Sequence, residues 1–373
     1  MKIVFIGCRD INLLGGIESY MANLSAELVN LGHSPIIYCE SDRNSIEIRN
    51  GVKIIHIKGP KSNIICKPWV GLKATLRTII KEKNVSIIHY NAWPPSLWCF
   101  IPRLFGVKSL MQGHGLEWQR SKYSLKQQKI MKFMEMLTAY MNQHLIMCSE
   151  EQTKYFKETY DKSAVTIPTA VNIPQNNRGQ DLQILEDMGL QHCKYVLFMA
   201  RLVQDKNPDF LICGFKNFKK SSHIDMKLVI AGSNEADFQY VDKLHRLAGN
   251  DKSIIFTGAI YGEKKEVILR NAYVFCLPST IEGLSIGLLE AMSYKLPIIA
   301  SDIKANRELL GDDAVWVNPE NVDDISDAIT FCVENKDIID GFRSKNFNKV
   351  INNYTWDKVA QKYVSYLYSI GAK

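Results

Sequence analysis

Two glutamates eight positions apart, Glu282 and Glu290, enclose a glycine-containing segment that leads into an apolar helix. Gly283 lets the backbone adopt conformations that a side chain would block. The first turn of the helix leaves free N–H groups and the positive end of the helix dipole, which together favour an anion. At a rise of about 1.5 Å per helical residue, carboxylates at these positions lie roughly 10 Å apart, too far for an acid–base pair. The segment therefore predicts a ligand with hydroxyl groups on both sides of a diphosphate.

Two basic residues, Arg201 and Lys206, stand five positions apart on the loop after a predicted strand. A guanidinium presents a planar fork of donors that fits phosphate oxygens, and an ammonium is a compact charge. Together with a helix N-terminus, two fixed cations can stabilise the negative charge that develops on a diphosphate leaving group without a metal ion. The alternative interpretation is a pair of solvated surface charges, which the spacing alone leaves open.

A glycine pair and a histidine complete the residues that could do chemistry. Gly15 and Gly16 lie on the first predicted loop, where the missing side chains let backbone N–H groups approach a phosphate or a sugar. A simple turn would use the same residues, and the pair is not a dinucleotide fingerprint, because no G-x-G-x-x-G follows the strand.

His114 stands between two glycines after another predicted strand, which exposes its ring. A structural turn histidine is the alternative there.

These motifs resemble, in their order along the chain, the signatures of the retaining glycosyltransferases of family 4, which have the two-domain GT-B architecture. The paired glutamates are similar to the family's signature, the Arg–Lys pair to its phosphate clamp and the glycine pair to its glycine loop. One motif alone would be weak support, but the ordered set spreads over most of the chain. The matching residues are Gly15, Gly16, Ile17 and Glu18, residues 200–208, residues 278–283, residues 290–292 and residues 296–301.

The resemblance implies a role for each position. Glu290 is expected to bind the ribose hydroxyls, Glu282 to bind hydroxyls of the transferred sugar, and His114 to contact the donor sugar. Glu117 is expected on the acceptor side and Gly258 beside the base. The diphosphate is expected to contact the backbone of Gly283, Leu284 and Ser285. A glutamate solvated at the domain edge is the alternative for Glu290.

The chain departs from the family pattern at a few positions. Residues 169–172 read Thr-Ala-Val-Asn where the family usually has Asn-Gly-Val-Asp. Lys295 stands where glycine is common, and residues 304–306 replace another expected glycine pair. These departures leave the sugar and the fine loop geometry open, but they do not touch the clamp.

Short apolar, β-rich runs alternate with amphipathic helical stretches, which is typical of the α/β class with parallel sheets covered on both faces. The pattern starts again after the polar residues 175–180. We therefore expect an N-terminal acceptor-side Rossmann-like domain at 1–172 and a nucleotide-sugar-binding Rossmann-like domain at 173–353. The C-terminal helix 354–373 is expected to pack back on the first domain. Two doubly wound domains would face a cleft lined by loops at the carboxyl ends of both sheets.

Charge is distributed unevenly along the chain. Residues 1–170 contain 22 Lys/Arg and 13 Asp/Glu, whereas the remainder contains 24 and 26. Basic and apolar residues are interleaved in residues 67–83 and 118–133, which fits contact with anionic lipid headgroups. The same pattern fits an ordinary amphipathic helix with a solvated basic face. We expect no nucleic acid partner, because no recognised binding motif accompanies the charge.

With 373 residues, 46% of them hydrophobic and 23% charged, the composition is that of a globular protein of two domains. No apolar run approaches the roughly 18 to 20 residues that span a bilayer, and the first residues lack signal-peptide features. The nine cysteines lack C-x-x-C spacing and favour buried free thiols in the cytosol. No cluster has metal-ligand spacing. We expect a cytoplasmic protein without metal or cofactor, and peripheral membrane contact is an open option.

Taken together, the residues and the resemblance predict a metal-independent retaining glycosyltransferase of the hexosyltransferase type, which uses a UDP- or GDP-linked sugar. The implied setting is the synthesis of surface polysaccharide or lipopolysaccharide, with a saccharide acceptor that a polyprenyl diphosphate could carry. Two alternatives stay open: a sugar phosphorylase or sugar-phosphate synthase of the same architecture, and a non-catalytic sugar-nucleotide-binding module. The missing dinucleotide fingerprint disfavours a dehydrogenase. The sugar, the base, the acceptor and the linkage are not determined by the sequence.

Overall fold

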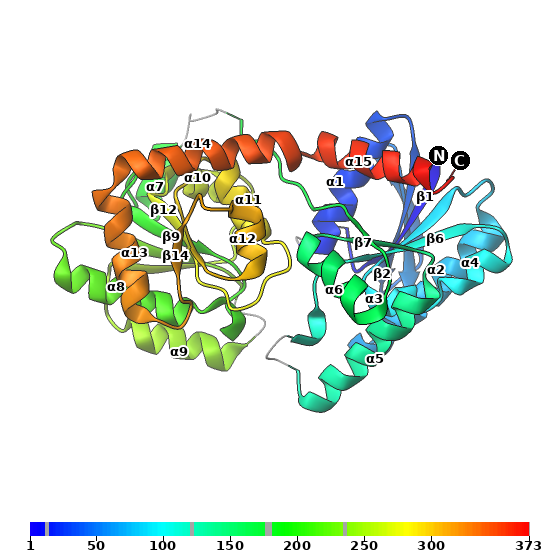
Figure 1. Ribbon diagram of the computed structural model, residues 1–373, viewed down its shortest axis with the longest axis horizontal. Helices are drawn as coiled ribbons and strands as arrows, with labels where there is room; N and C mark the ends of the chain where they lie inside the picture. Colours follow the sequence, from blue (N-terminus) through cyan, green and yellow to red (C-terminus); the bar gives the residue numbers. More distant parts are fainter. Residues whose placement is uncertain (12–14, 120–122, 176–180, 234–236, 373) are drawn as a thin grey trace. The chain divides into compact units, whose positions relative to one another are not determined.

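The computed structural model describes residues 1–11, 15–119, 123–175, 181–233 and 237–372. The chain forms two compact units, one from Met1–Ala170 with Trp356–Lys373 and the other from Val171–Thr355. Figure 1 shows that each unit is a sheet with helices on its faces. The predicted α/β class with two doubly wound, Rossmann-like halves is confirmed. The bounds of the units differ by two residues from the predicted domain bounds.

The first unit is built on a sheet with the strand order β3-β4-β2-β1-β5-β6-β7-β8. All neighbours are parallel except β3, which pairs antiparallel with β4. The strands are β1 (Lys2–Cys8), β2 (Ser34–Ser41), β3 (Ser45–Arg49), β4 (Val52–Lys58), β5 (Ile87–Asn91), β6 (Lys108–Gly113), β7 (His144–Met147) and β8 (Val165–Thr166). Most side chains of β1, β5 and β6 are buried, as in parallel strands covered on both faces.

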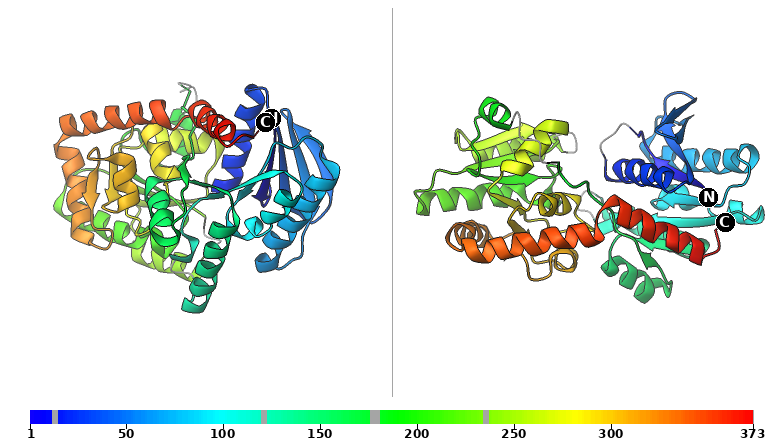
Figure 2. Two further views of the ribbon diagram at one scale, coloured as in Figure 1. Left: turned by 45° about the vertical axis from the view of Figure 1, so that its right-hand side comes forward. Right: turned by 90° about the horizontal axis from the view of Figure 1, so that it is seen from above.

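Helices cover both faces of this sheet. They are α1 (Gly16–Asn30), α2 (Asn63–Lys81), α3 (Trp93–Ser96), α4 (Phe100–Leu104), α5 (Leu125–Met141), α6 (Glu150–Tyr160) and α15 (Trp356–Ser369), with the 3-10 helix η1 (Glu117–Gln119). Ile3 and Phe5 point to the face that α1 and α15 cover. Val4 and Ile6 alternate with them and point to the face that α2, α3, α5 and α6 cover. Figure 2 shows α15 alongside α1.

The second unit has a wholly parallel sheet with the order β11-β10-β9-β12-β13-β14. Its strands are β9 (Tyr195–Met199), β10 (Lys227–Ala231), β11 (Ile254–Gly258), β12 (Val274–Leu277), β13 (Ile298–Ser301) and β14 (Val315–Val317). Its helices are α7 (Asp181–Asp187), η2 (Gln204–Lys206), α8 (Pro208–Ser221), α9 (Phe238–Ala248), α10 (Gly262–Asn271), α11 (Ile286–Ser293), α12 (Lys304–Leu310), α13 (Val322–Glu334) and α14 (Lys336–Asn353). Among the residues described, none of the helices of either unit has the length and apolar character needed to cross a bilayer.

The strand order of both sheets reverses beside the first strand. In the first unit, β2 lies on one side of β1 and β5 on the other; in the second, β10 and β12 flank β9 in the same way. The connections that leave the strands on either side of this reversal turn away in opposite directions, which leaves a crevice at the carboxyl ends of the strands. Ligands of doubly wound sheets bind at this point. The sequence motifs that follow β1, β9 and β12 therefore stand where the topology favours binding.

The expectation for the cysteines holds for most of them. All nine are free thiols, and six are buried. Cys193 is exposed, so burial in apolar surroundings is not general.

Two glycines inside helices provide a matched test of the packing in the second unit. At Gly214 in α8, a Cβ would lie 2.7 Å from Ile325 Cγ2 and 3.0 Å from the carbonyl oxygen of Val322, both in α13. At Gly341 in α14, no atom lies within 4 Å of that position. We expect Gly214→Ala to lower the free energy of unfolding by about 1–3 kcal/mol through overpacking. Gly341→Ala should raise it by about 0.5–1 kcal/mol through helix propensity.

Urea unfolding of the two variants and the parent protein measures both changes. Shifts of the same sign would contradict the close packing of α8 against α13.

Candidate functional site

Several of the predicted site residues follow strands at the carboxyl edge of the second unit's sheet. Arg201 and Lys206 follow β9, Gly258 ends β11, and Glu282 follows β12. Strands β9 and β12 are paired neighbours. Because the strand order reverses between them, their loops border the crevice in which such a sheet binds ligands. The structure thus brings the clamp segment and the glutamate segment together.

An ion pair joins the two segments. Lys206 Nζ lies 2.5 Å from Glu282 Oε1, and the side chains are 14% and 9% exposed. The backbone N–H of Thr280 also donates to the carbonyl oxygen of Asp205, at 3.0 Å. Removing an ammonium and a carboxylate from water is costly, and their mutual contact offsets that cost. Sequence reasoning assigned Lys206 to phosphate and Glu282 to a sugar, and it did not predict that they contact each other.

Two glycines let neighbouring segments pack tightly against the loop after β9. A Cβ on Gly232 would lie 2.0 Å from the carbonyl oxygen of Ala200, and a Cβ on Gly287 would lie 3.2 Å from that of Met199. Gly287 is the second residue of α11. The first turn of this helix is therefore held directly against the carboxyl end of β9.

Helix α11 begins where the sequence predicts. Ser285 is the N-cap residue, and its hydroxyl accepts a hydrogen bond from the backbone N–H of Leu288 at 3.4 Å. Gly283 and Leu284 form the bend that precedes the cap. The other N–H groups of the first turn have no partner within the helix, and the helix dipole adds partial positive charge. An anion in the crevice would meet backbone donors of α11 as well as the Lys206 ammonium.

Glu290 has a partner that sequence reasoning missed. Its Oε1 lies 2.5 Å from Lys265 Nζ, and the side chains are 22% and 30% exposed. Glu290 belongs to α11 and Lys265 to α10. The carboxylate is therefore paired rather than simply solvated. A carboxylate has several acceptor positions, so one ion pair leaves it able to accept hydrogen bonds from ligand hydroxyls. The only sequence signal for this pair is a lysine doublet in the first half of α10.

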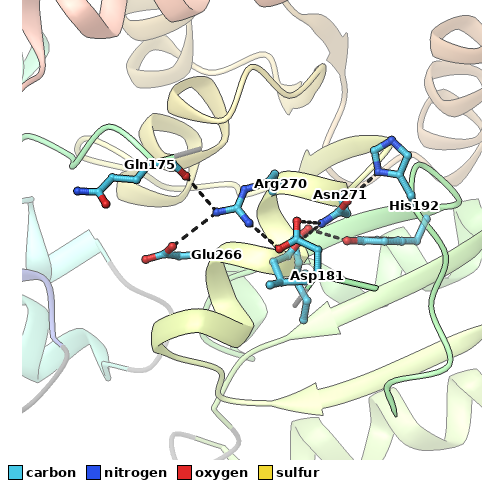
Figure 3. Close-up of polar contacts among 9 residues, drawn as sticks. Gln175, Asp181, His192, Glu266, Arg270 and Asn271 are labelled. Carbon is cyan, nitrogen blue, oxygen red and sulfur yellow. Dashed lines mark hydrogen bonds and ion pairs between the residues drawn. The ribbon is translucent and has the colours of Figure 1, made fainter. Parts of the chain in front are cut away.

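A polar network fixes the far end of α10, as Figure 3 shows. Arg270 Nη1 lies 2.7 Å from Asp181 Oδ1, and Asn271 Nδ2 donates to Asp181 Oδ2 at 3.0 Å. Arg270 Nη2 also donates to the carbonyl oxygen of Gln175 at 3.4 Å. These contacts tie α7 and Gln175 to α10. They therefore fix the helix that presents Lys265 to Glu290.

Arg201 and Gly258 are exposed residues at this edge of the sheet. Gly258 has a φ of 67°, and its carbonyl oxygen accepts a hydrogen bond from the Gly232 N–H at 3.0 Å. A Cβ at this position would have no atom within 4 Å, so the backbone of Gly258 is open to a ligand.

In the first unit, Gly15 caps α1 and Gly16 is its first residue. The buried Glu18 folds back, so that a Cβ on Gly15 would lie 2.1 Å from its Oε2. Its Oε1 accepts hydrogen bonds from the backbone N–H and Nε of Arg9, at 3.3 and 3.2 Å. This carboxylate is paired with the Arg9 guanidinium, and its remaining acceptor positions can take a hydrogen bond from a ligand hydroxyl.

His114 follows β6, and its Nε2 lies 3.0 Å from Oδ1 of Asn91, the last residue of β5. Its ring makes an edge-to-face contact with the ring of Tyr20 of α1, with the centroids 5.2 Å apart. Burial, and to a smaller degree the positive charge of Lys67, lowers the pKa of His114 to about 4. The imidazole is therefore neutral at neutral pH. Because an amide oxygen only accepts, Nε2 carries the proton, and Nδ1 keeps a lone pair that can accept from a hydroxyl.

Glu117 is the first residue of η1, and its side chain lies outside the described part of the structure. Within the described ranges, no group of three or more His, Cys, Asp or Glu residues could hold a metal ion.

Two family models match adjacent parts of the chain. The model described as Glycosyltransferase Family 4 matches residues 14–174, and the model described as Glycosyl transferases group 1 matches residues 190–350. Between them they span most of both units.

Similar proteins are found by sequence and by fold. The chain is 25% identical to an uncharacterized glycosyltransferase of Methanocaldococcus jannaschii, over 95% of this chain and 94% of that protein. It is 26% identical to the UDP-Gal:alpha-D-GlcNAc-diphosphoundecaprenol alpha-1,3-galactosyltransferase of Escherichia coli, over 78% of each protein. Among solved structures, sucrose-phosphate synthase from Thermosynechococcus elongatus is similar with a TM-score of 0.84 and 16% identity, over 99% of this chain and 98% of that chain. At that identity, the likeness shows the fold alone.

The two lysine–glutamate pairs are expected to contribute unequally to stability. Lys206→Met leaves the nearly buried Glu282 without its cation, whereas Lys265→Met leaves a more exposed carboxylate. We expect losses in the free energy of unfolding of about 3 kcal/mol for the first variant and about 1 kcal/mol or less for the second. Adding Glu282→Gln to Lys206→Met should recover part of the loss, because it removes the unpaired charge. Chemical denaturation of this set measures the coupling, and equal losses in the two single variants would refute the difference in burial.

Proposed function

Since the chain belongs to the family 4 glycosyltransferases of GT-B architecture, we propose that it is a retaining enzyme that transfers a sugar from a UDP- or GDP-linked donor to a saccharide acceptor. The observation that carries this proposal is the Lys206–Glu282 pair at the reversal of strand order, beside the N-terminus of α11. A cation and a hydroxyl acceptor stand there together, as a diphosphate joined to a sugar requires.

Donor binding exchanges the partners of this pair. The Lys206 ammonium moves from Glu282 to the diphosphate, and Glu282 accepts hydrogen bonds from hydroxyls of the sugar. Arg201, on the same loop, and the N–H groups of Gly283, Leu284 and Ser285 complete the contacts to phosphate oxygens. Glu290, held by Lys265, accepts from the ribose hydroxyls, and Gly258 lies beside the base.

The transfer breaks the bond between the sugar C1 and the phosphate oxygen and forms a bond between C1 and the acceptor oxygen. Both events occur on the same face of the sugar, which retains the configuration. The departing phosphate oxygen takes the proton of the acceptor hydroxyl. Its growing charge is stabilised by Lys206, Arg201 and the backbone donors of α11, which act from fixed positions. Neutral His114 accepts from a hydroxyl of the donor sugar, and Glu117 contributes on the acceptor side.

We propose a lipid-linked saccharide as the acceptor, in surface polysaccharide or lipopolysaccharide synthesis at the inner face of the plasma membrane. The Escherichia coli relative is named for a diphosphoundecaprenol-linked acceptor, and its identity to this chain extends over 78% of each protein. The basic first unit supports contact with an anionic membrane. No cofactor and no nucleic acid takes part.

A sugar-phosphate synthase is the second candidate, because the fold of sucrose-phosphate synthase is similar over nearly the whole chain. A phosphorylase of the same architecture would consume inorganic phosphate instead of releasing a nucleoside diphosphate. A non-catalytic binding module would bind the nucleotide without turnover. The product released from UDP- and GDP-sugars, assayed with sugar-phosphate and lipid-linked saccharide acceptors, separates these candidates. The anomeric configuration of the product tests retention.

Arg201→Ala and Lys206→Ala should each lower turnover by on the order of 100-fold or more, as expected for lost stabilisers of transition-state charge. Lys220→Ala, at an exposed lysine in the last turn of α8, is the matched control and should leave turnover unchanged. Because Lys206 also pairs with Glu282, melting curves must show that the variant is folded under assay conditions. Near-normal rates in both clamp variants would refute the clamp.

Treatment with EDTA should leave activity intact, because Lys206, Arg201 and α11 supply the positive charge that a divalent ion would otherwise provide. The measurement is the initial rate after dialysis against chelator, with and without added magnesium or manganese. A rate that disappears with EDTA and returns with one of these ions would contradict the metal-free mechanism.

A further inference from the structure

The side of α2 that faces away from the sheet is apolar. Val70 and Ala74 of this helix are buried in the core of the first unit. Four large side chains of the same helix are exposed, and at 3.6 residues per turn they fall within about 60° of one another around the axis, roughly opposite the buried pair. A surface helix usually carries polar residues there. We name these side chains the α2 ridge: Ile65, Trp69, Leu76 and Ile80.

Positive charge accompanies the ridge without negative charge. Helix α2 contains no Asp or Glu. Lys73 places its Nζ 4.9 Å from the centroid of the Trp69 ring, so its charge lies along the ridge. Lys81, in the last turn of the helix, is also exposed.

Helix α5 repeats this combination on the same side of the sheet. Both helices pack on the same core cluster, each contacts α3, and Figure 1 shows them on one side of the sheet. On the outer side of α5, the exposed Ile130 and Phe133 alternate with the exposed Lys126 and Lys129. The one acidic residue of α5, Glu135, is buried and accepts hydrogen bonds from two tyrosine hydroxyls. The outer sides of both helices are thus apolar and basic.

We propose that the α2 ridge, with the outer side of α5, docks on an anionic lipid bilayer. The aliphatic side chains and Trp69 would enter the boundary between headgroups and acyl chains, where an indole ring is favoured. The lysines would reach the lipid phosphates while their methylene stems cover apolar surface. A surface of one charge sign matches the uniformly anionic face of a bilayer. Two copies of this surface would repel each other, which argues against self-association.

This inference rests on the proposed function, because it names the surface that would bring the enzyme to a lipid-linked acceptor. It uses none of the residues assigned to the donor. Membrane binding and nucleotide binding can therefore be tested separately.

The test uses the full-length protein and sedimentation with vesicles of phosphatidylcholine, alone or with phosphatidylglycerol. We expect binding to the anionic vesicles only, weakened by salt. Ile80→Glu should lower the partition coefficient by on the order of tenfold or more, because it places a charge among the ridge side chains. Lys126→Gln and Lys129→Gln should each lower it by about fivefold. The matched control is Ile48→Glu on the edge strand β3, where the isoleucine is 77% exposed, compared with 73% for Ile80.

Failure of the wild-type protein to bind anionic vesicles at low salt would overturn the proposal. Equal losses for Ile48→Glu and Ile80→Glu would also overturn it, because binding would then not depend on the ridge. Self-association of the wild-type protein that Ile80→Glu abolishes without vesicles would assign the ridge to a second copy instead. Thermal shifts with UDP and GDP, measured on the same variants, should equal those of the parent. If the protein binds vesicles but neither UDP nor GDP shifts its melting temperature, the proposed function is refuted and the docking surface is still supported.

Discussion

The site of the second unit depends on one contact, between the Glu282 carboxylate and the Lys206 ammonium. Both groups are nearly excluded from water, and they lie where the strand order of the parallel sheet reverses. Strand order places the loops of β9 and β12 side by side, and close packing at Gly232 and Gly287 leaves them little freedom. Lys206 and Glu282 then offset each other's desolvation. Such an ion pair is only modestly favoured over other arrangements in which each of the two charges has an equally good partner. A diphosphate joined to a hydroxyl-rich group is such an alternative, because it offers an anion to the lysine and donors to the glutamate at the same time. When no ligand is bound, the ion pair therefore keeps the charged lysine and the charged glutamate in the site.

The second lysine–glutamate pair works through a helix rather than a loop. Lys265 reaches Glu290 from α10, and the contacts of Arg270 and Asn271 with Asp181 fix the other end of that helix. A side chain on a regular helix is positioned by the packing of the whole helix, so its geometry is less sensitive to loop motion. The two glutamates thus differ in support. Under the proposed mechanism, the lysine that holds Glu282 moves to the ligand, whereas the lysine that holds Glu290 stays in place.

Much of this arrangement follows from the sequence, and the missing parts have a common physical cause. Short apolar runs predicted the central strands, and the segment that contains Gly283 predicted the entry into α11, because these signals are local. The short edge strand β3, with mostly exposed side chains, and the two-residue β8 carry too little pattern to be recognised. The partners of Lys206, Glu290 and Gly15 depend on contacts across loops and helices, which spacing does not encode. Lys295 is intermediate between features that local sequence predicts and features that it does not. The residue follows the C-cap of α11 and has a φ of 56°, the left-handed conformation for which glycine is common at this place.

The two faces of the first unit's sheet differ in whether the core accounts for the apolar side chains of the helices that cover them. The face under α1 and α15 buries aromatic and aliphatic side chains from both helices, so its apolar residues are accounted for by the core. On the other face, the core needs only the inner sides of α2 and α5. The outer isoleucines, tryptophan and phenylalanine add nothing to that core, and each remains an unfavourable contact with water at about 25 cal/mol per Å². Fold stability therefore does not account for them, whereas a surface that covers apolar groups and neutralises lysines at once does. The excess of basic residues in the first half of the chain is consistent with the same explanation.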